Sequence, residues 1–171
     1  MAKEKILYQF TRKNMVLVAR HRRLPNGHPL DLEMITHPGA VCIVPFLNSK
    51  QIVLMRQYRA AVDSYLYELP AGTLDDNENP LTCAQRELKE ETGYSAKSWK
   101  KVGKIFPLPA YSDEQILIYK AAALKFEQSK LEADEVIEVC PTTLAEIKRL
   151  FARGKIIDAK TICALTFCRV L

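Results

Sequence analysis

Residues 72–94 read GTLDDNENPLTCAQRELKEETGY, and this stretch carries the clearest local signals in the chain. Asn79 precedes Pro80, which places a capping side chain before a proline that suits the first helical position. Gly93 supplies the residue type at which a helix commonly stops in the left-handed conformation. The stretch therefore predicts a helix over Pro80–Thr92.

Three glutamates of this helix, Glu87, Glu90 and Glu91, fall within an arc of about 100° on one face. Like charges at such spacings each cost roughly a few tenths of a kcal/mol, so the helix gains nothing from them unless something cancels their charge. A divalent cation would do so, and carboxylates without His or Cys partners suit Mg²⁺ or Mn²⁺ better than Zn²⁺. Arg86 lies one turn before Glu90 and can brace it by an ion pair.

For a lone Lys-Glu-Glu triplet, a solvated helix face would be the favoured interpretation. The wider spacing, however, resembles the Nudix box at every fixed identity, an agreement expected by chance roughly once in a billion start positions. One departure is Tyr94, where the Nudix family usually has an aliphatic packing residue. The matching identities are Gly72, Glu78, Arg86, Glu87, Glu90, Glu91 and Gly93.

The resemblance implies a hydrolase whose helix glutamates hold magnesium against a substrate diphosphate. Glu87 and Glu91 would be the main side-chain ligands, and Glu90 would support them or join the shell of a second metal ion. The backbone carbonyl of Ala71 would be a further ligand. Glu90, Glu91 and Arg86 are also expected to take part in catalysis.

Flanking segments resemble the ADP-ribose pyrophosphatase and nucleoside-diphosphate-sugar branch of the family. This branch tends to have a proline-rich loop past the box, and the loop at 106–114 places Pro109 among the expected substrate-binding residues. The N-terminal sheet of this branch commonly helps to form a dimer, so we expect a homodimer. The other two matching segments are Gln57-Tyr58-Arg59 and Glu68-Leu69-Pro70-Ala71-Gly72.

Two arginines precede the box and could bind phosphate through their guanidinium forks. Arg56 and Arg59 are an odd number of residues apart, so they face opposite sides of a regular strand. The resemblance favours Arg59, and a surface salt bridge is an equal alternative for Arg56. Glu68 is expected either to bind a terminal sugar hydroxyl or to pair with Arg59.

The resemblance to ADP-ribose pyrophosphatases implies that the base that activates water lies on an acidic loop after the proline-rich segment. Aligning the strand that follows the loop with the family pattern puts Ala133 near the position where the glutamate should stand. Glu132 and Glu135 flank that position, and Glu135 is preferred because it directly precedes the strand. A solvated acidic loop is an even alternative.

The remaining chain alternates strand signals with two further helices. Turn residues at 24–27 separate strand signals at 6–18 and 30–36, which predicts a small N-terminal antiparallel sheet as a subdomain over residues 1–38. Helices that must cover both faces of one sheet imply an α/β fold, an α/β/α sandwich with a mixed sheet, for residues 39–171. Its strands are expected at 41–46, 51–58, 101–106, 116–124 and 136–140, and its later helices at 143–153 and from Asp158 to the C-terminus.

Composition excludes several classes of protein. The net charge of +5 is spread along the chain, and the absence of a basic run with interleaved aromatics argues against a nucleic-acid partner. No stretch approaches the roughly 20 apolar residues of a membrane span, and residues 1–10 lack the apolar core of a signal peptide. The 5 scattered cysteines suit a reduced, cytoplasmic protein.

The leading hypothesis is Mg²⁺-dependent hydrolysis of ADP-ribose to AMP and ribose 5-phosphate. Within the same enzyme class, GDP-mannose or another nucleotide sugar is the alternative substrate. An alternative of another class is a Nudix module that binds a nucleotide without cutting it. The complete set of helix glutamates argues against that module, because a pure sensor gains nothing from a repulsive metal site.

Overall fold

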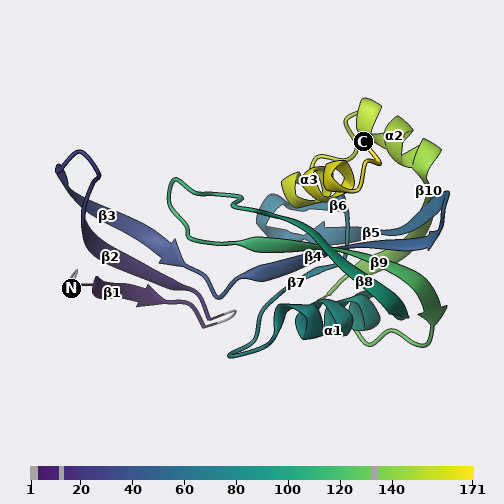
Figure 1. Ribbon diagram of the computed structural model, residues 1–171, viewed down its shortest axis with the longest axis horizontal. Helices are drawn as coiled ribbons and strands as arrows, with labels where there is room; N and C mark the ends of the chain where they lie inside the picture. The colour runs from purple at the N-terminus through teal and green to yellow at the C-terminus, as the bar shows by residue number, and fades with distance from the viewer. Residues whose placement is uncertain (1–3, 12–13, 132–134) are drawn as a thin grey trace.

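The computed structural model describes residues 4–11, 14–131 and 135–171, and these residues form two β-sheets and three α-helices (Figure 1). The N-terminal sheet is antiparallel in the order β1-β2-β3. Its predicted turn at 24–27 is confirmed by the hydrogen bond that Leu24 N–H donates to the carbonyl of His28 at 2.8 Å. The strands are β1 (Glu4–Gln9), β2 (Val16–Arg23) and β3 (Pro29–Thr36).

The strand signal at 6–18 resolves into β1 and the beginning of β2. The chain turns between them, and Phe10 N–H donates to the carbonyl of Met15 at 3.0 Å. Asn14 stands in this turn with φ of 48°, a left-handed conformation that asparagine tolerates.

The second sheet has seven strands and is mixed, as predicted. Its order is β10-β5-β4-β9-β8, while β6 pairs with β5 and β7 pairs with β4. The β4–β9 pair is parallel and the other pairs are antiparallel. The strands are β4 (Ala40–Asn48), β5 (Gln51–Arg59), β6 (Ser64–Glu68), β7 (Ala71–Thr73), β8 (Tyr94–Ile105), β9 (Ile116–Phe126) and β10 (Ile137–Thr143), and a short 3-10 helix, η1 (Ala60–Val62), follows β5.

The helices α1 (Pro80–Thr92), α2 (Leu144–Ala152) and α3 (Ala159–Phe167) cover both faces of this sheet (Figure 1). Alternation along β4 shows how the two layers arise, because successive side chains of a strand point to opposite faces. Val41 and Ile43 pack with Leu88 of α1. Cys42 and Val44 pack instead with Ile147 of α2 and Leu165 of α3. The predicted α/β/α sandwich is confirmed.

Local end signals place the first two helices correctly. The side chain of Asn79 accepts a hydrogen bond from Leu81 N–H at 2.9 Å, and Gly93 closes α1 with φ of 75°. Thr143 caps α2 by accepting from Glu146 N–H at 3.2 Å. The expectation that the third helix runs to the C-terminus is wrong. α3 ends at Phe167, and the chain then turns through Arg169, whose φ is 57°.

Two short strands and part of a long one were not predicted. β6 and β7 become strands by pairing with β5 and β4. β7, with 3 residues, is too short for a strand signal of its own. β8 begins at Tyr94, directly after the helix stop, and not near residue 101. Within the described ranges, no helix is long and apolar enough to cross a membrane.

The N-terminal sheet meets the rest of the chain at the loop between β8 and β9 (Figure 1). Ile35 N–H donates to the carbonyl of Tyr111 at 2.8 Å, and Asp113 N–H donates to the carbonyl of Ile35 at 3.2 Å. The loop that contains Pro109 is therefore held beside β3.

Candidate active site

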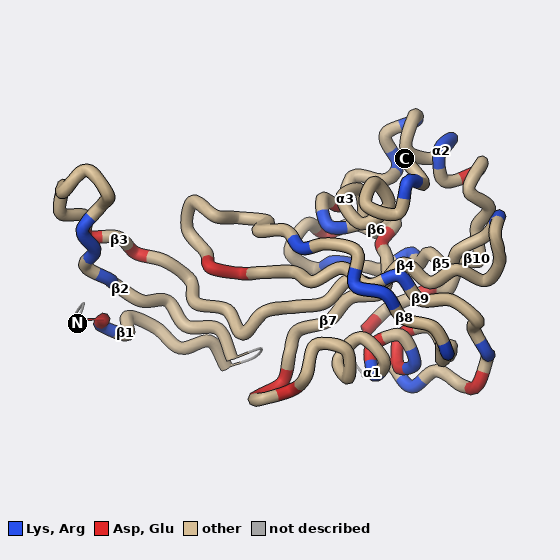
Figure 2. The backbone as a smooth tube through the Cα atoms, in the orientation of Figure 1, with Lys and Arg blue, Asp and Glu red and all other residues tan. Residues whose placement is uncertain are grey.

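The glutamate face of α1 opens on a cavity of about 520 Å³. Glu87, Glu90 and Glu91 all line it, together with Glu135 from the loop before β10. Glu87 and Glu91 are buried, at 9% and 2% exposure. Figure 2 shows acidic segments on α1 and on the loop between β7 and α1. The predicted clustering of the three box glutamates on one helix face is confirmed.

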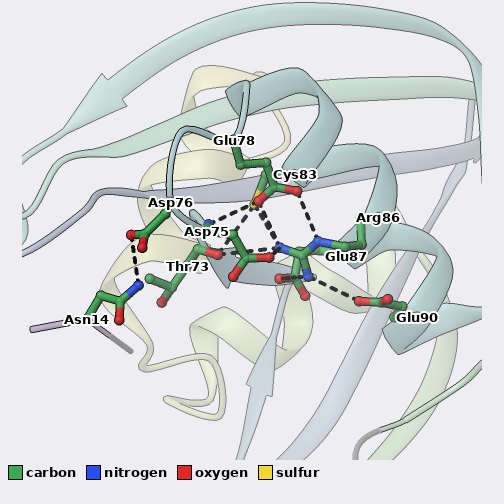
Figure 3. Close-up of polar contacts among 9 residues, drawn as sticks. All are labelled: Asn14, Thr73, Asp75, Asp76, Glu78, Cys83, Arg86, Glu87 and Glu90. Atoms are coloured by element: carbon green, nitrogen blue, oxygen red, sulfur yellow. Dashed lines mark hydrogen bonds and ion pairs between the residues drawn. The ribbon is translucent and has the colours of Figure 1, made fainter. Parts of the chain in front are cut away.

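Arg86 stands at the centre of the hydrogen bonds in Figure 3. Its Nη1 donates to Glu87 Oε1 at 2.7 Å and to Glu90 Oε2 at 3.1 Å, so the predicted brace of Glu90 is confirmed and extends to Glu87. Its Nε and Nη2 each donate to one oxygen of Glu78 at 3.0 Å. These hydrogen bonds from Arg86 lower the pKa of Glu78 to about 2.

Ionisation of the two buried glutamates, Glu87 and Glu91, is energetically costly. Burial raises the pKa of Glu87 to about 7, even though Arg86 opposes the shift. Burial, and next the charge of Glu87, raise the pKa of Glu91, while Ala71 N–H donates to Glu91 Oε2 at 3.0 Å and opposes the shift. Nearby positive charge would favour the ionised form of both groups.

This arrangement fits a divalent cation by its donor chemistry. The raised pKa values show that Arg86 offsets only part of the cost of ionising Glu87 and Glu91, and their hard oxygens suit Mg²⁺ or Mn²⁺. Their oxygens do not yet converge. No group of three or more His, Cys, Asp or Glu side chains in residues 4–11, 14–131 and 135–171 is set to hold a metal ion as it stands. Arg86 holds one oxygen of Glu87 and one of Glu90.

Arg59 lines the same cavity and is held by a buried acid. Its Nε and Nη2 donate to the two oxygens of Glu68 at 2.8 and 2.7 Å, and Lys160 Nζ also donates to Glu68. Burial alone would raise the pKa of Glu68, but the hydrogen bonds and charges of Arg59 and Lys160 lower it overall. Glu68 is 1% exposed, so the predicted pairing with Arg59 is confirmed, and its position favours this role over contact with a sugar hydroxyl.

Two predicted substrate-binding residues are not brought to the cavity. Arg56 Nη1 donates to Glu138 at 3.1 Å, and its guanidinium lies over the ring of Tyr65 at 4.3 Å. The alternative of a surface salt bridge is thus confirmed for Arg56, which faces away from Arg59 as strand alternation requires. Pro109 lies in the loop beside β3 and does not line the cavity, because that loop follows the N-terminal sheet.

Of the two proposed catalytic bases, only Glu135 lies within the described residues. Glu135 lines the cavity, and its charge contributes to the raised pKa values of Glu87 and Glu91. Glu132 and the adjacent Ala133 lie outside the described residues. The choice of Glu135 over Glu132 stays a prediction.

Sequence reasoning missed three residues of this region. Gln57 lines the cavity and belongs to the Gln57-Tyr58-Arg59 segment quoted above. Strand alternation could have placed its side chain on the same side of the strand as that of Arg59. Asn14 reaches the cavity from the β1–β2 turn and its Nδ2 donates to Asp76 at 3.0 Å (Figure 3). Lys160 bonds to Glu68 across 92 residues of sequence, and no local signal predicts such a contact.

Comparisons with known proteins place this chain in a family of hydrolases. The model of the NUDIX domain family matches residues 36–165. An ADP-ribose pyrophosphatase of Bacillus subtilis (strain 168) is 34% identical over 99% of this chain and 91% of its own length. A GDP-mannose pyrophosphatase of Cronobacter sakazakii (strain ATCC BAA-894) is 33% identical over 94% and 83%. A crystal structure of an ADP compounds hydrolase superposes with a TM-score of 0.82 at 24% identity, over 99% of this chain and 91% of that one, and supports the fold.

Proposed function

Because this chain belongs to the Nudix family, we propose that it is a hydrolase that cuts the diphosphate bridge of a nucleoside diphosphate linked to a sugar. ADP-ribose is the leading substrate, and its hydrolysis gives AMP and ribose 5-phosphate. The observation that carries the proposal is the cavity in which the α1 glutamates, Arg59 and Glu135 meet. The similarity to an ADP-ribose pyrophosphatase over 99% of this chain supports it.

A divalent cation completes the proposed site, since Nudix hydrolases generally use such ions. We propose Mg²⁺, with Mn²⁺ as the alternative, held by Glu87 and Glu91 with support from Glu90 and the carbonyl of Ala71. A bound ion of this kind neutralises phosphoryl oxygens and lowers the pKa of water. Within this chain, Arg86 keeps Glu87 and Glu90 in place at the cavity.

Arg59 and Glu135 have separate proposed roles. The fork of Arg59 is oriented by Glu68 and presents positive charge to the phosphate oxygens of the substrate. Glu135 accepts the proton of the water that attacks one phosphorus atom, while the bridging oxygen leaves with the other phosphate. If Glu135→Gln and Glu132→Gln both keep more than about a third of wild-type turnover, neither acts as the base.

GDP-mannose is the second candidate substrate, because the similarity to a GDP-mannose pyrophosphatase covers 94% of this chain. The diphosphate would meet the same residues in either case, and the base and the sugar would differ. A nucleotide-binding module without catalysis is the candidate of another class. It would bind the same ligands without releasing products.

The test is a substrate panel of ADP-ribose, GDP-mannose, UDP-glucose and a diadenosine polyphosphate. Products are detected by phosphate release with alkaline phosphatase, after chelation and after addition of Mg²⁺ or Mn²⁺. We expect the highest kcat/KM on ADP-ribose and no turnover after chelation. A higher kcat/KM on GDP-mannose would replace the leading substrate, and the absence of products from every member would leave only the binding module.

A further inference from the structure

Gln57 carries a buried polar atom that none of the described residues satisfies. The residue lies on β5, is 5% exposed and lines the cavity. Across residues 4–11, 14–131 and 135–171, its Oε1 has no hydrogen-bond partner. Leaving such an atom unpaired costs stability, and folded proteins rarely retain one without a reason. Because Gln57 lines the cavity, a ligand bound there is the nearest source of a partner once the side chain turns toward it.

The strands around Gln57 bring it beside the residues proposed to act on the diphosphate. Arg59 is two residues further along β5 and lines the same cavity, so both side chains share one side of the strand. On the neighbouring strand, Ile137 pairs with Gln57, and Val136 accepts a hydrogen bond from Tyr58 N–H at 3.0 Å. Glu135 therefore enters the cavity next to Gln57 and Arg59.

The chemistry of the unpaired atom restricts its partner. An amide carbonyl oxygen can only accept hydrogen bonds. The ionised oxygens of a diphosphate are acceptors as well, so they cannot satisfy it. The partner must be a hydrogen-bond donor, and the O–H groups of the sugars and of water are donors that the reactants supply.

We propose that the side-chain carbonyl of Gln57 accepts a hydrogen bond from an O–H group of the bound reactants, either a sugar hydroxyl of the substrate or the attacking water. This inference rests on the proposed function, which supplies both kinds of O–H group. Gln57 is then a further ligand-binding residue of the site.

Gln57→Met removes the acceptor at similar volume. We expect kcat/KM on the best substrate to fall by about 3- to 10-fold, the value of one hydrogen bond. The matched control is Gln51→Met, the same change at the far end of β5, where Gln51 Oε1 accepts from Asn48 Nδ2 at 2.9 Å. That control should keep wild-type kinetics, and a Gln57→Met variant that also keeps them would overturn the inference.

Substrate analogues that each lack one sugar hydroxyl separate the two donors. If a sugar hydroxyl is the donor, the variant and the wild type cleave the matching analogue at similar kcat/KM, because the interaction is already lost. If water is the donor, Gln57→Met lowers kcat by a similar factor on every analogue. Both patterns support the inference and identify the source of the O–H group.

Thermal unfolding without metal or substrate gives a readout independent of activity. Replacing an unpaired buried carbonyl by an apolar group should leave Tm unchanged or raise it by about 2–4 °C. A lower Tm would assign Gln57 a structural role and overturn the inference. The proposed function is decided separately by the turnover of the wild type in the kinetic experiment. Only the comparison of Gln57→Met with the wild type concerns Gln57.

Discussion

Glu91 is the most buried of the three α1 glutamates and receives a hydrogen bond from Ala71 N–H. Its charge is costly in the metal-free protein and is needed only when a cation and a substrate are bound. We expect Glu91→Gln to lower turnover by at least about a hundredfold without loss of the fold. Steady-state kinetics in Mg²⁺ and circular dichroism of the variant test this, and near-normal turnover would remove the proposed role of the box.

The raised pKa of Glu87 predicts how stability depends on pH. Burial raises this pKa from 4.5 to about 7, so between these values the folded metal-free protein binds more protons than the unfolded chain. Its free energy of unfolding therefore falls as pH rises through this range. Over this pH range, we expect the Tm of the chelated wild type to fall by about 3 °C or more beyond any fall in the Tm of Glu87→Gln. An equal change of Tm with pH in the two proteins would contradict this.

Lys160 stabilises the acid that orients Arg59. It is a partner of Glu68 and donates to Asp158 Oδ1 at 3.0 Å, in a largely buried position. Removing one member of a buried ion pair leaves charge uncompensated, so Lys160→Met should cost about 3 kcal/mol, or a Tm lower by roughly 6–12 °C. The exposed Lys148→Met is the control, and equal melting temperatures for the two variants would exclude a stabilising role for Lys160.

At the scale of elements, β7 meets the side chain of Glu87 from α1 at Gly72. A Cβ at this position would lie 1.9 Å from Glu87 Oε1, which is the end of a flexible side chain. Gly72→Ala should therefore fold but displace Glu87, and a misplacement of this size can cost about 10²-fold in kcat/KM. Gly154→Ala, with no atom within 4 Å of its Cβ but a φ of +64°, should lose stability and keep kcat. The reverse pattern in the two variants would refute the argument.

At the scale of the whole molecule, the N-terminal sheet extends away from the main sheet (Figure 1). It carries exposed apolar side chains. Ile6 and Tyr8 of β1 are 62% and 55% exposed, which is unusual for a monomer's surface when such residues cluster. A sheet of three strands needs a second layer, so we expect a homodimer built on it. Light scattering should give twice the 19.5 kDa of one chain. A 19.5 kDa species alone at micromolar concentration would contradict the prediction.

The dimer prediction can be located by substitution. Ile6→Asp places a charge in the expected interface and should produce monomers without altering the main sheet. Phe167→Asp changes another exposed apolar residue, on α3, and should leave the dimer intact. Dissociation by both variants, or by neither, would place the interface elsewhere.

The sequence by itself determined the helix Pro80–Thr92, its glutamate face and the order of layers in the main domain. The helix and its face depend on signals within a few residues of one another: the Asn79 cap, the Gly93 stop and the helical spacing of Glu87, Glu90 and Glu91. The layers follow from predicted helices that must cover both faces of one sheet. The cytoplasmic location stays a prediction of the same kind, drawn from composition alone.

Only the tertiary structure decided which residues meet. Lys160 reaches Glu68 across 92 residues, and Pro109 follows the N-terminal sheet away from the cavity. Gln57 Oε1 is buried without a partner among the described residues. β6 and β7 exist because β5 and β4 supply their hydrogen-bond partners. Such contacts depend on strand register and on burial of charge between distant segments, and no local spacing in the sequence encodes either of these.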